Sequence, residues 1–224
     1  MIKLVVLFVL IASLAEVQPL SPSCAKVMLE YGPKILKLEK NITQTSINEV
    51  KQINDAKYLV GSIADEAQVS VNTQLKNLKK TVQESIKKAL KQKKNISKCL
   101  TKETIAIHKV DTRGIDKCRL DLQAALLITN VVKDLSKEKS ALSVNTKLCA
   151  IKNPWIASNL RACLDQELKN TENKVNELQN NLDGKLEQAQ KDSIACIGVK
   201  LGNLDISIEA VGIEFESCVN DILN

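Results

Sequence analysis

Cysteine is the residue type in this chain best suited to covalent chemistry. Seven cysteines occur, and six of them lie between residues 99 and 218, separated by 18, 30, 13, 32 and 21 residues. The six are Cys99, Cys118, Cys149, Cys163, Cys196 and Cys218, and the seventh is Cys24. Thiols can form disulfides, hold zinc or act as nucleophiles, and the residues around them decide between these chemistries.

The surrounding residues favour disulfides. No two cysteines have Cys-x-x-Cys spacing, and the chain has a single histidine, His108, so the usual ligand set of a zinc site is missing. A nucleophilic cysteine needs a partner base, and no protease signature surrounds His108 or any thiol. The G-x-S-x-G, H-E-x-x-H and glycine-rich phosphate motifs are absent as well. We therefore predict no catalytic residue, no metal site, no cofactor and no enzymatic activity.

The first residues have the pattern of a secretory leader. Residues 1–15 contain an early lysine, an apolar run and small residues before the expected cut, so we predict a signal peptide there. No later stretch approaches the ~20 apolar residues of a transmembrane helix. We expect a secreted, extracellular protein, in which disulfides are the default state of cysteine. Two sequons predict N-glycosylation at Asn41 and Asn95.

The composition predicts an all-α fold. Aromatic residues make up 2% of the chain, so the core must be built from aliphatic side chains, which suits helix packing better than a β-sandwich. We expect long amphipathic helices packed as antiparallel hairpins or an elongated bundle, stapled by disulfides. The cysteine distribution divides the mature chain into an N-terminal helical arm, residues 16–98, and a six-cysteine helical domain, residues 99–224.

Capping signals predict where the first helices begin and end. Ser21-Pro22 reads as a start and Gly32-Pro33 as a stop. Residues 46–49 have the form of a capping box, which predicts a long helix over 46–92. This helix is either straight or bent, with Gly61 as the expected hinge. Its apolar residues follow the three- and four-residue steps of a coiled-coil seam. They are Ile53, Ala56, Val60, Ile63, Ala67, Val71, Leu75, Leu78, Val82, Ile86 and Ala89.

Further signals divide the second half. Residues 108–114 predict a turn, Asn153-Pro154 predicts a helix start, and Asp183-Gly184 predicts a hinge into the last helix. Over 204–215 the apolar residues also alternate as in a strand. We expect a helix there, because the helical period covers more of the segment.

Lysines dominate the outer face of the predicted 46–92 helix and the turn after it. They are Lys76, Lys79, Lys80, Lys87, Lys88, Lys91, Lys93 and Lys94. Such a face can be simply solvated, which we favour, or can bind polyanions and anionic membranes. We do not expect nucleic-acid binding, because no arginine or aromatic residue accompanies the lysines to read or stack on bases.

Symmetry about the predicted hinges suggests a disulfide pairing. Cross-linked residues of two antiparallel helices lie at similar distances from the hinge between them. The pairs Cys99–Cys118, Cys149–Cys218 and Cys163–Cys196 satisfy this condition. Six cysteines allow 15 pairings, so this set is a hypothesis. Cys24 is left unpaired or available for an intermolecular bridge.

The pattern Cys-x18-Cys-x30-Cys-x13-Cys-x32-Cys-x21-Cys over 99–218 resembles the secreted insect proteins that carry the tsetse EP domain. The resemblance implies a helical, cysteine-framed extracellular domain with no assigned enzymatic activity, found in gut and other secretions. This chain lacks the further cysteine that often follows the third in that family, and offers only Trp155 among the aromatics between the third and fourth. Residues 16–98 are not covered, and no functional residue is carried over.

Three functions remain open. The first is a secreted, non-enzymatic protein that acts by binding another macromolecule or by self-assembly. The second is a carrier of an apolar ligand or lipid, since aliphatic amphipathic helices can enclose acyl chains. The third is binding of anionic microbial or membrane surfaces through the lysines between 76 and 94.

Overall fold

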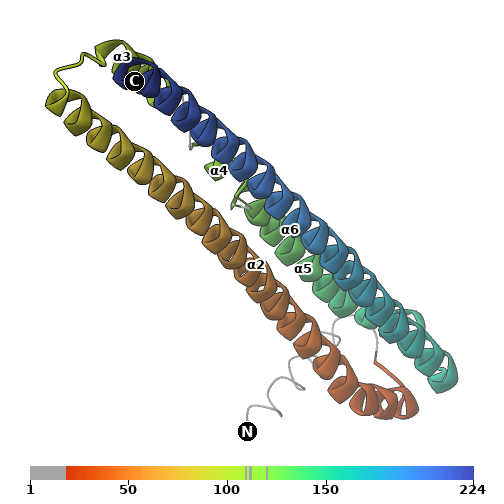
Figure 1. Ribbon diagram of the computed structural model, residues 1–224. Helices are drawn as coiled ribbons and strands as arrows, with labels where there is room; N and C mark the ends of the chain where they lie inside the picture. The colour runs from red at the N-terminus through yellow and green to blue at the C-terminus, as the bar shows by residue number, and fades with distance from the viewer. Residues whose placement is uncertain (1–18, 109, 111–112, 120) are drawn as a thin grey trace, which may run out of the picture. The chain divides into compact units, whose positions relative to one another are not determined.

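Helices account for nearly all of the chain that the computed structural model describes, which is residues 19–108, 110, 113–119 and 121–224. These residues form five helices and no strand, which confirms the all-α prediction (Figure 1). The helices are α2 (Pro22–Lys91), α3 (Ser97–His108), α4 (Arg113–Asp116), α5 (Asp121–Lys152) and α6 (Ala157–Leu223). The predicted signal peptide, residues 1–15, lies outside the described residues. No described helix has a stretch apolar enough to cross a bilayer.

The helices are shared between two compact units. Unit 1 combines residues up to 54 with residues 124–186, and unit 2 combines residues 55–123 with 187–224. Each unit therefore contains part of α2 and part of α6. The units do not follow the division at residues 98 and 99, because residues on both sides of it contribute to each.

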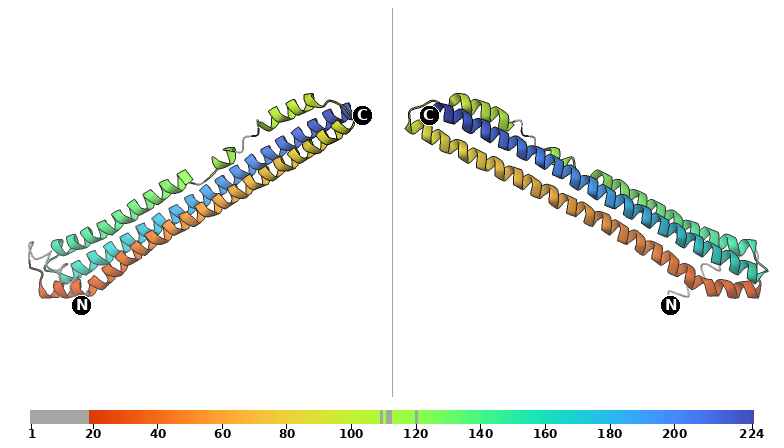
Figure 2. Two further views of the ribbon diagram at one scale, coloured as in Figure 1. Left: turned by 90° about the vertical axis from the view of Figure 1, so that its left-hand side faces the viewer. Right: turned by 45° about the vertical axis from the view of Figure 1, so that its right-hand side comes forward.

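Unit 1 is a bundle of three helical segments. The first part of α2 packs against α5 and the first part of α6, and the last two run antiparallel as a hairpin (Figures 1 and 2). Its aliphatic core includes Ile42, Leu142, Leu160 and Leu164, each at most 1% exposed. These residues recur at helical spacing in each segment, so one buried stripe per helix produces the bundle.

Unit 2 combines the rest of α2 with α3, α4 and the rest of α6. The last turns of α2, the start of α3 and the end of α6 share a core (Figure 2). Its members include Val82, Ala89, Cys99 and Phe215. The seam predicted along α2 is buried at Val60, Ala67, Val71 and other positions.

The predicted start at Ser21 is confirmed, and the predicted stop at Gly32-Pro33 is wrong. Ser21 Oγ accepts a hydrogen bond from the Cys24 amide at 3.3 Å, as an N-cap does. The helix then continues through Pro33. Pro33 and Leu29, whose carbonyl loses its amide partner, are both exposed, so water can replace the missing bond. Tyr31 and Ile35 are buried on either side and hold the helix in the core.

The capping box predicted at residues 46–49 is also wrong as a helix start. Ser46 and Glu49 both lie inside α2, and 24 residues of this helix precede Ser46. Glu49 is buried and accepts a hydrogen bond from Gln179 instead of reaching back to cap an amide. The helix runs through Gly61 without a break in its secondary structure.

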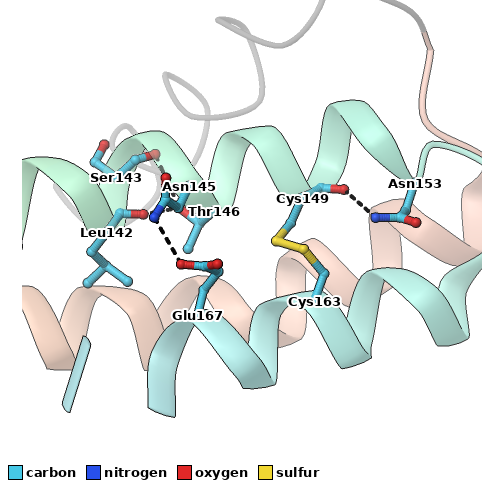
Figure 3. The surroundings of a disulfide bond; sticks show 8 residues. All are labelled: Leu142, Ser143, Asn145, Thr146, Cys149, Asn153, Cys163 and Glu167. Atoms are coloured by element: carbon cyan, nitrogen blue, oxygen red, sulfur yellow. Dashed lines mark hydrogen bonds between the residues drawn. A yellow bond between two sulfur atoms is a disulfide. The ribbon is translucent and has the colours of Figure 1, made fainter. Parts of the chain in front are cut away.

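The breaks in the second half fall only partly where they were predicted. A break in the 108–114 segment is confirmed, because α3 ends at His108 and α4 begins at Arg113. Asn153-Pro154 does not start a helix. Its asparagine closes the end of α5, where Asn153 Nδ2 donates to the Cys149 carbonyl at 3.0 Å (Figure 3). Asp183-Gly184 is not a hinge, since α6 continues through it.

All three predicted disulfides are wrong. The bonds are Cys99–Cys218, Cys118–Cys196 and Cys149–Cys163, with Cα–Cα distances of 5.8, 5.6 and 5.7 Å. The prediction failed because it centred two pairs near Asp183-Gly184, which lies inside a continuous helix. The turn that matters is the connection at residues 153–156. Figure 3 shows the bond closest to it, between α5 and α6.

Cys24 has no disulfide partner in the structure, as predicted. It is fully buried in unit 1, and its thiol donates weakly to the Asn153 carbonyl at 3.5 Å. An intermolecular bridge, the other alternative for this residue, requires an exposed sulfur. The buried position therefore favours a free thiol.

Candidate binding sites

A pocket in unit 1 lies where α2, α5 and α6 meet. It has a volume of about 90 Å³. Its apolar walls come from Leu127, Val131, Leu135, Leu178 and Leu182. Its polar lining residues are Glu49, Asn130, Asp134, Gln179, Asn181 and Lys185. A pocket with an aliphatic wall and polar groups beside it has the general composition of a small-molecule site.

Glu49 is the most unusual residue in this pocket. Its side chain is 2% exposed. Oε1 accepts a hydrogen bond from Gln179 Nε2 at 3.3 Å, whereas Oε2 is buried and has no hydrogen-bond partner among the described residues. A buried carboxyl oxygen without a partner costs free energy, so native proteins rarely retain one without a reason.

The surroundings of Glu49 favour its neutral form. Burial raises the pKa of the Glu49 carboxyl, the hydrogen bond from Gln179 lowers it, and the charge of Asp183 raises it further. The other acid in the lining, Asp134, pairs with Lys137 at 3.0 Å. A cation placed in the pocket would reverse this balance by stabilising the ionised form of Glu49.

In unit 2, α6 has an apolar face opposite its buried one. We call it the outer apolar stripe, and its members are Ala195, Val199, Gly202, Ile206, Ala210 and Ile213. Val199, Ile206 and Ile213 are 63%, 68% and 62% exposed. The buried face of the same segment contains Ile197 and Ile208. Most of each of these three side chains is therefore accessible, and Ile213 also lines a groove between α6 and α3.

The two faces of α6 explain the alternating pattern in the sequence. Successive helical residues are ~100° apart, so residues two positions apart lie ~200° apart and on opposite faces. Leu204 and Ile208 point toward the core side, and Ile206 lies on the outer side. Alternation over 204–215 thus arises from a helix with two apolar faces, not from a strand.

The charges around the stripe are mostly negative. Residues 187–224 contain seven carboxylates, counting Asp and Glu, against two lysines. Glu209 is exposed beside the stripe, whereas Asp205 is half-buried and accepts a hydrogen bond from Gln74 of α2 at 2.8 Å. A partner for this face must therefore supply apolar side chains in the centre and positive charge at the edges.

The opposite sign is found on α2 in the same unit. All eight lysines singled out from the sequence, from Lys76 to Lys94, are exposed. None of them forms an ion pair with a described residue, although Lys94 Nζ donates to the Leu223 carbonyl at 2.9 Å. Six of these lysines lie on α2, as predicted, whereas Lys93 and Lys94 follow its last residue, Lys91.

The two predicted glycosylation sites are both exposed. Asn41 lies within α2, and Asn95 lies in the turn before α3. Asn95 Oδ1 accepts a hydrogen bond from the Ser97 amide at 2.9 Å, which caps the start of α3. Glycosylation uses the side-chain nitrogen and is compatible with this contact. It stays a prediction at both positions.

Sequence reasoning missed both candidate sites, although signals for them were present. Glu49 lies seven residues after Ile42 and four before Ile53, so it occupies the buried seam where an ionisable residue is unexpected. Val199, Ile206 and Ile213 recur every seven residues opposite the seam. In the described part of the chain, no three His, Cys, Asp or Glu residues are grouped as metal ligands.

Comparison with known proteins adds no assignment to these sites. No family model, curated protein or solved structure matches the chain.

Proposed function

We propose that this is a secreted, non-enzymatic helical protein that acts by binding another protein, and that the outer apolar stripe of α6 is its binding surface. The observation that carries the proposal is the exposure of Val199, Ile206 and Ile213, each more than 60%, on one face of a helix whose other face already forms the core. Burying an aliphatic side chain of this size contributes roughly 1–2 kcal/mol. Three together can supply the centre of an interface.

The partner we propose is an amphipathic helix with an apolar face and basic edges. Its apolar face would pack on the stripe, where Gly202 and two alanines allow close approach, and its lysines or arginines would face the carboxylates beside the stripe. A second copy of α6 fits less well. Two such segments would bring Asp205, Glu209 and their neighbours toward each other, and like charges disfavour that pairing.

Secretion is supported by the three disulfides, since these persist in oxidising compartments. The cysteine spacing over 99–218 supports a relationship to the tsetse EP-domain proteins, which we propose on that basis alone.

The test uses the full mature chain and a synthetic peptide of about 21 residues, a helix of ~30 Å, made of leucine and lysine in an amphipathic pattern. We expect it to bind, and expect the leucine–glutamate counterpart not to. Ile206→Gln should weaken the binding of the leucine–lysine peptide by about tenfold or more, which corresponds to ~1.4 kcal/mol. The matched control is Val69→Gln, which changes an equally exposed residue on α2.

Sedimentation of the protein alone separates the two forms of interaction. A monomer that binds the leucine–lysine peptide supports a foreign partner. A dimer that Ile206→Gln dissociates would show that a second copy covers the stripe. Equal effects of Ile206→Gln and Val69→Gln would contradict any specific role for the stripe.

A second candidate, carriage of a small apolar ligand, is favoured by the pocket beside Glu49.

A further inference from the structure

The pocket in unit 1 contains a buried hydrogen-bond acceptor, Oε2 of Glu49, that no described residue satisfies. We infer that this pocket binds a small apolar amine, whose protonated head pairs with Glu49 and whose hydrocarbon body lies against the leucines. The inference does not depend on the partner proposed for α6, because that stripe is in unit 2 and this pocket is in unit 1.

The size of the pocket limits the ligand. A water takes ~30 Å³ in the liquid, so the 90 Å³ available here corresponds to about three groups of that size, which is room for the head and first carbons of one small molecule and not for an acyl chain of a membrane lipid. The leucine and valine side chains from α5 and α6 make water a poor filler for most of this space.

The polar residues of the pocket determine which ligand head group fits. Oε2 of Glu49 is an acceptor without a donor among the described residues. Around it lie two further carboxylates, Asp134 on α5 and Asp183 on α6, and one lysine, Lys185 on α6. Lys137 pairs with Asp134 and offsets its charge. With Glu49 ionised, these five groups still sum to a negative charge. An ammonium group brings up to three N–H donors and a positive charge, so it satisfies both the unpaired oxygen and the local field.

The alternatives are less well matched. A carboxylic acid would bring a second anion toward Glu49, and only Lys185, which is exposed, would offset it. An alcohol can donate one hydrogen bond to Oε2 but supplies no charge. Binding of the amine should therefore be stronger than binding of either analogue of equal length.

The probe is hexylamine, compared with hexanol and hexanoate, each titrated into the full mature chain by calorimetry. We expect hexylamine to bind most tightly. Glu49→Gln keeps the shape of the side chain but removes its charge. It should weaken the binding of hexylamine by about tenfold or more, as expected for the loss of a buried charged hydrogen bond. Glu167→Gln is the control, because Glu167 is another hydrogen-bonded glutamate of unit 1 outside the pocket.

Thermal unfolding of both variants establishes that they fold. Loss of hexylamine binding in folded Glu49→Gln, with binding retained in Glu167→Gln, supports the inference. Equal affinity for all three probes, equal affinity of wild type and Glu49→Gln, or no binding of hexylamine to the wild type would overturn it. The last result would mean that water alone satisfies Glu49.

Discussion

Cys149 and Cys163 are joined across the connection between α5 and α6, with their Cα atoms 5.7 Å apart. The other two disulfides are nested around the same connection in the sequence. The midpoints of the three pairs fall at positions 156, 157 and 158.5. The three disulfides are thus arranged almost symmetrically in the sequence about one connection, residues 153–156.

Removal of the innermost disulfide should destabilise the protein. Because it closes a 14-residue separation, Cys149→Ser combined with Cys163→Ser should lower the free energy of unfolding by about 2–4 kcal/mol. Urea unfolding followed by circular dichroism measures the loss. Cys24→Ala, which breaks no disulfide, should cost less, about 1 kcal/mol. A double variant as stable as wild type, or peptide maps with other pairs, would contradict the pairing.

Because Glu49 is buried, replacing its carboxyl with a neutral group should stabilise the folded protein by an amount that depends on pH. Because burial raises the pKa of this carboxyl above its ordinary value of 4.5, the folded chain holds the proton more tightly than the unfolded chain. The wild type then loses stability as pH rises from that ordinary value through the raised pKa. Asp134, Asp183 and Lys185 are the charged groups nearby.

Glu49→Gln should therefore raise the melting temperature near pH 7 in the absence of ligand, and the gain should shrink toward zero below about pH 4. Calorimetry at both pH values gives the comparison. A variant less stable than wild type at pH 7 would show that the carboxylate is satisfied in the native protein.

The hydrogen bond between Tyr31 and Asp165 should contribute measurably to unit 1. Tyr31 is 3% exposed, and its hydroxyl donates to Asp165 Oδ1 at 2.6 Å. Tyr31→Phe keeps the ring and removes this bond, so we expect a loss of about 1 kcal/mol in urea unfolding. Tyr58→Phe changes a residue that is 81% exposed and should have no effect. Equal free energies of unfolding for the two variants would mean that the hydrogen bond of Tyr31 contributes no more stability than a hydrogen bond to water.

The exposed lysines of α2 predict salt-sensitive binding to anionic vesicles. Changing Lys87, Lys88 and Lys91 to glutamate should weaken vesicle binding by well over about tenfold, since each basic residue near an anionic surface contributes ~1 kcal/mol. Co-sedimentation with phosphatidylserine vesicles at low and high salt provides the measurement. Reversal at Lys26, Lys34 and Lys37 of unit 1 is the control. Unchanged binding after the first reversal would leave this face simply solvated.

Much of the fold was predictable from local signals. Ser21 identified the start of α2, and the seam from Ile53 onward identified its buried face. Pro33 misled the prediction, because a single proline costs one hydrogen bond and only the packing of Tyr31 and Ile35 shows that the helix can tolerate it. Packing of this kind is a tertiary property that local signals do not contain.

The errors at the turns had a larger consequence for the cysteines. Asn153-Pro154 and Asp183-Gly184 carry similar local signals, and only the first interrupts the helices. Once the turn is placed correctly, the nested pairing follows from the same symmetry argument. Glu49 was misinterpreted for a similar reason. In the sequence it fits a capping box and a buried position on the seam equally well, and only its hydrogen bond with Gln179 of α6 distinguishes the two.

A map of where a partner helix contacts the protein shows directly whether the outer apolar stripe is a binding surface. The leucine–lysine peptide, carrying a benzophenone on its apolar face, would be irradiated with the full mature chain and the products digested and analysed by mass spectrometry. We expect cross-links concentrated on residues 195–213 of α6 and their loss in Ile206→Gln. Cross-links scattered over acidic segments of both units, unaffected by Ile206→Gln, would contradict this expectation.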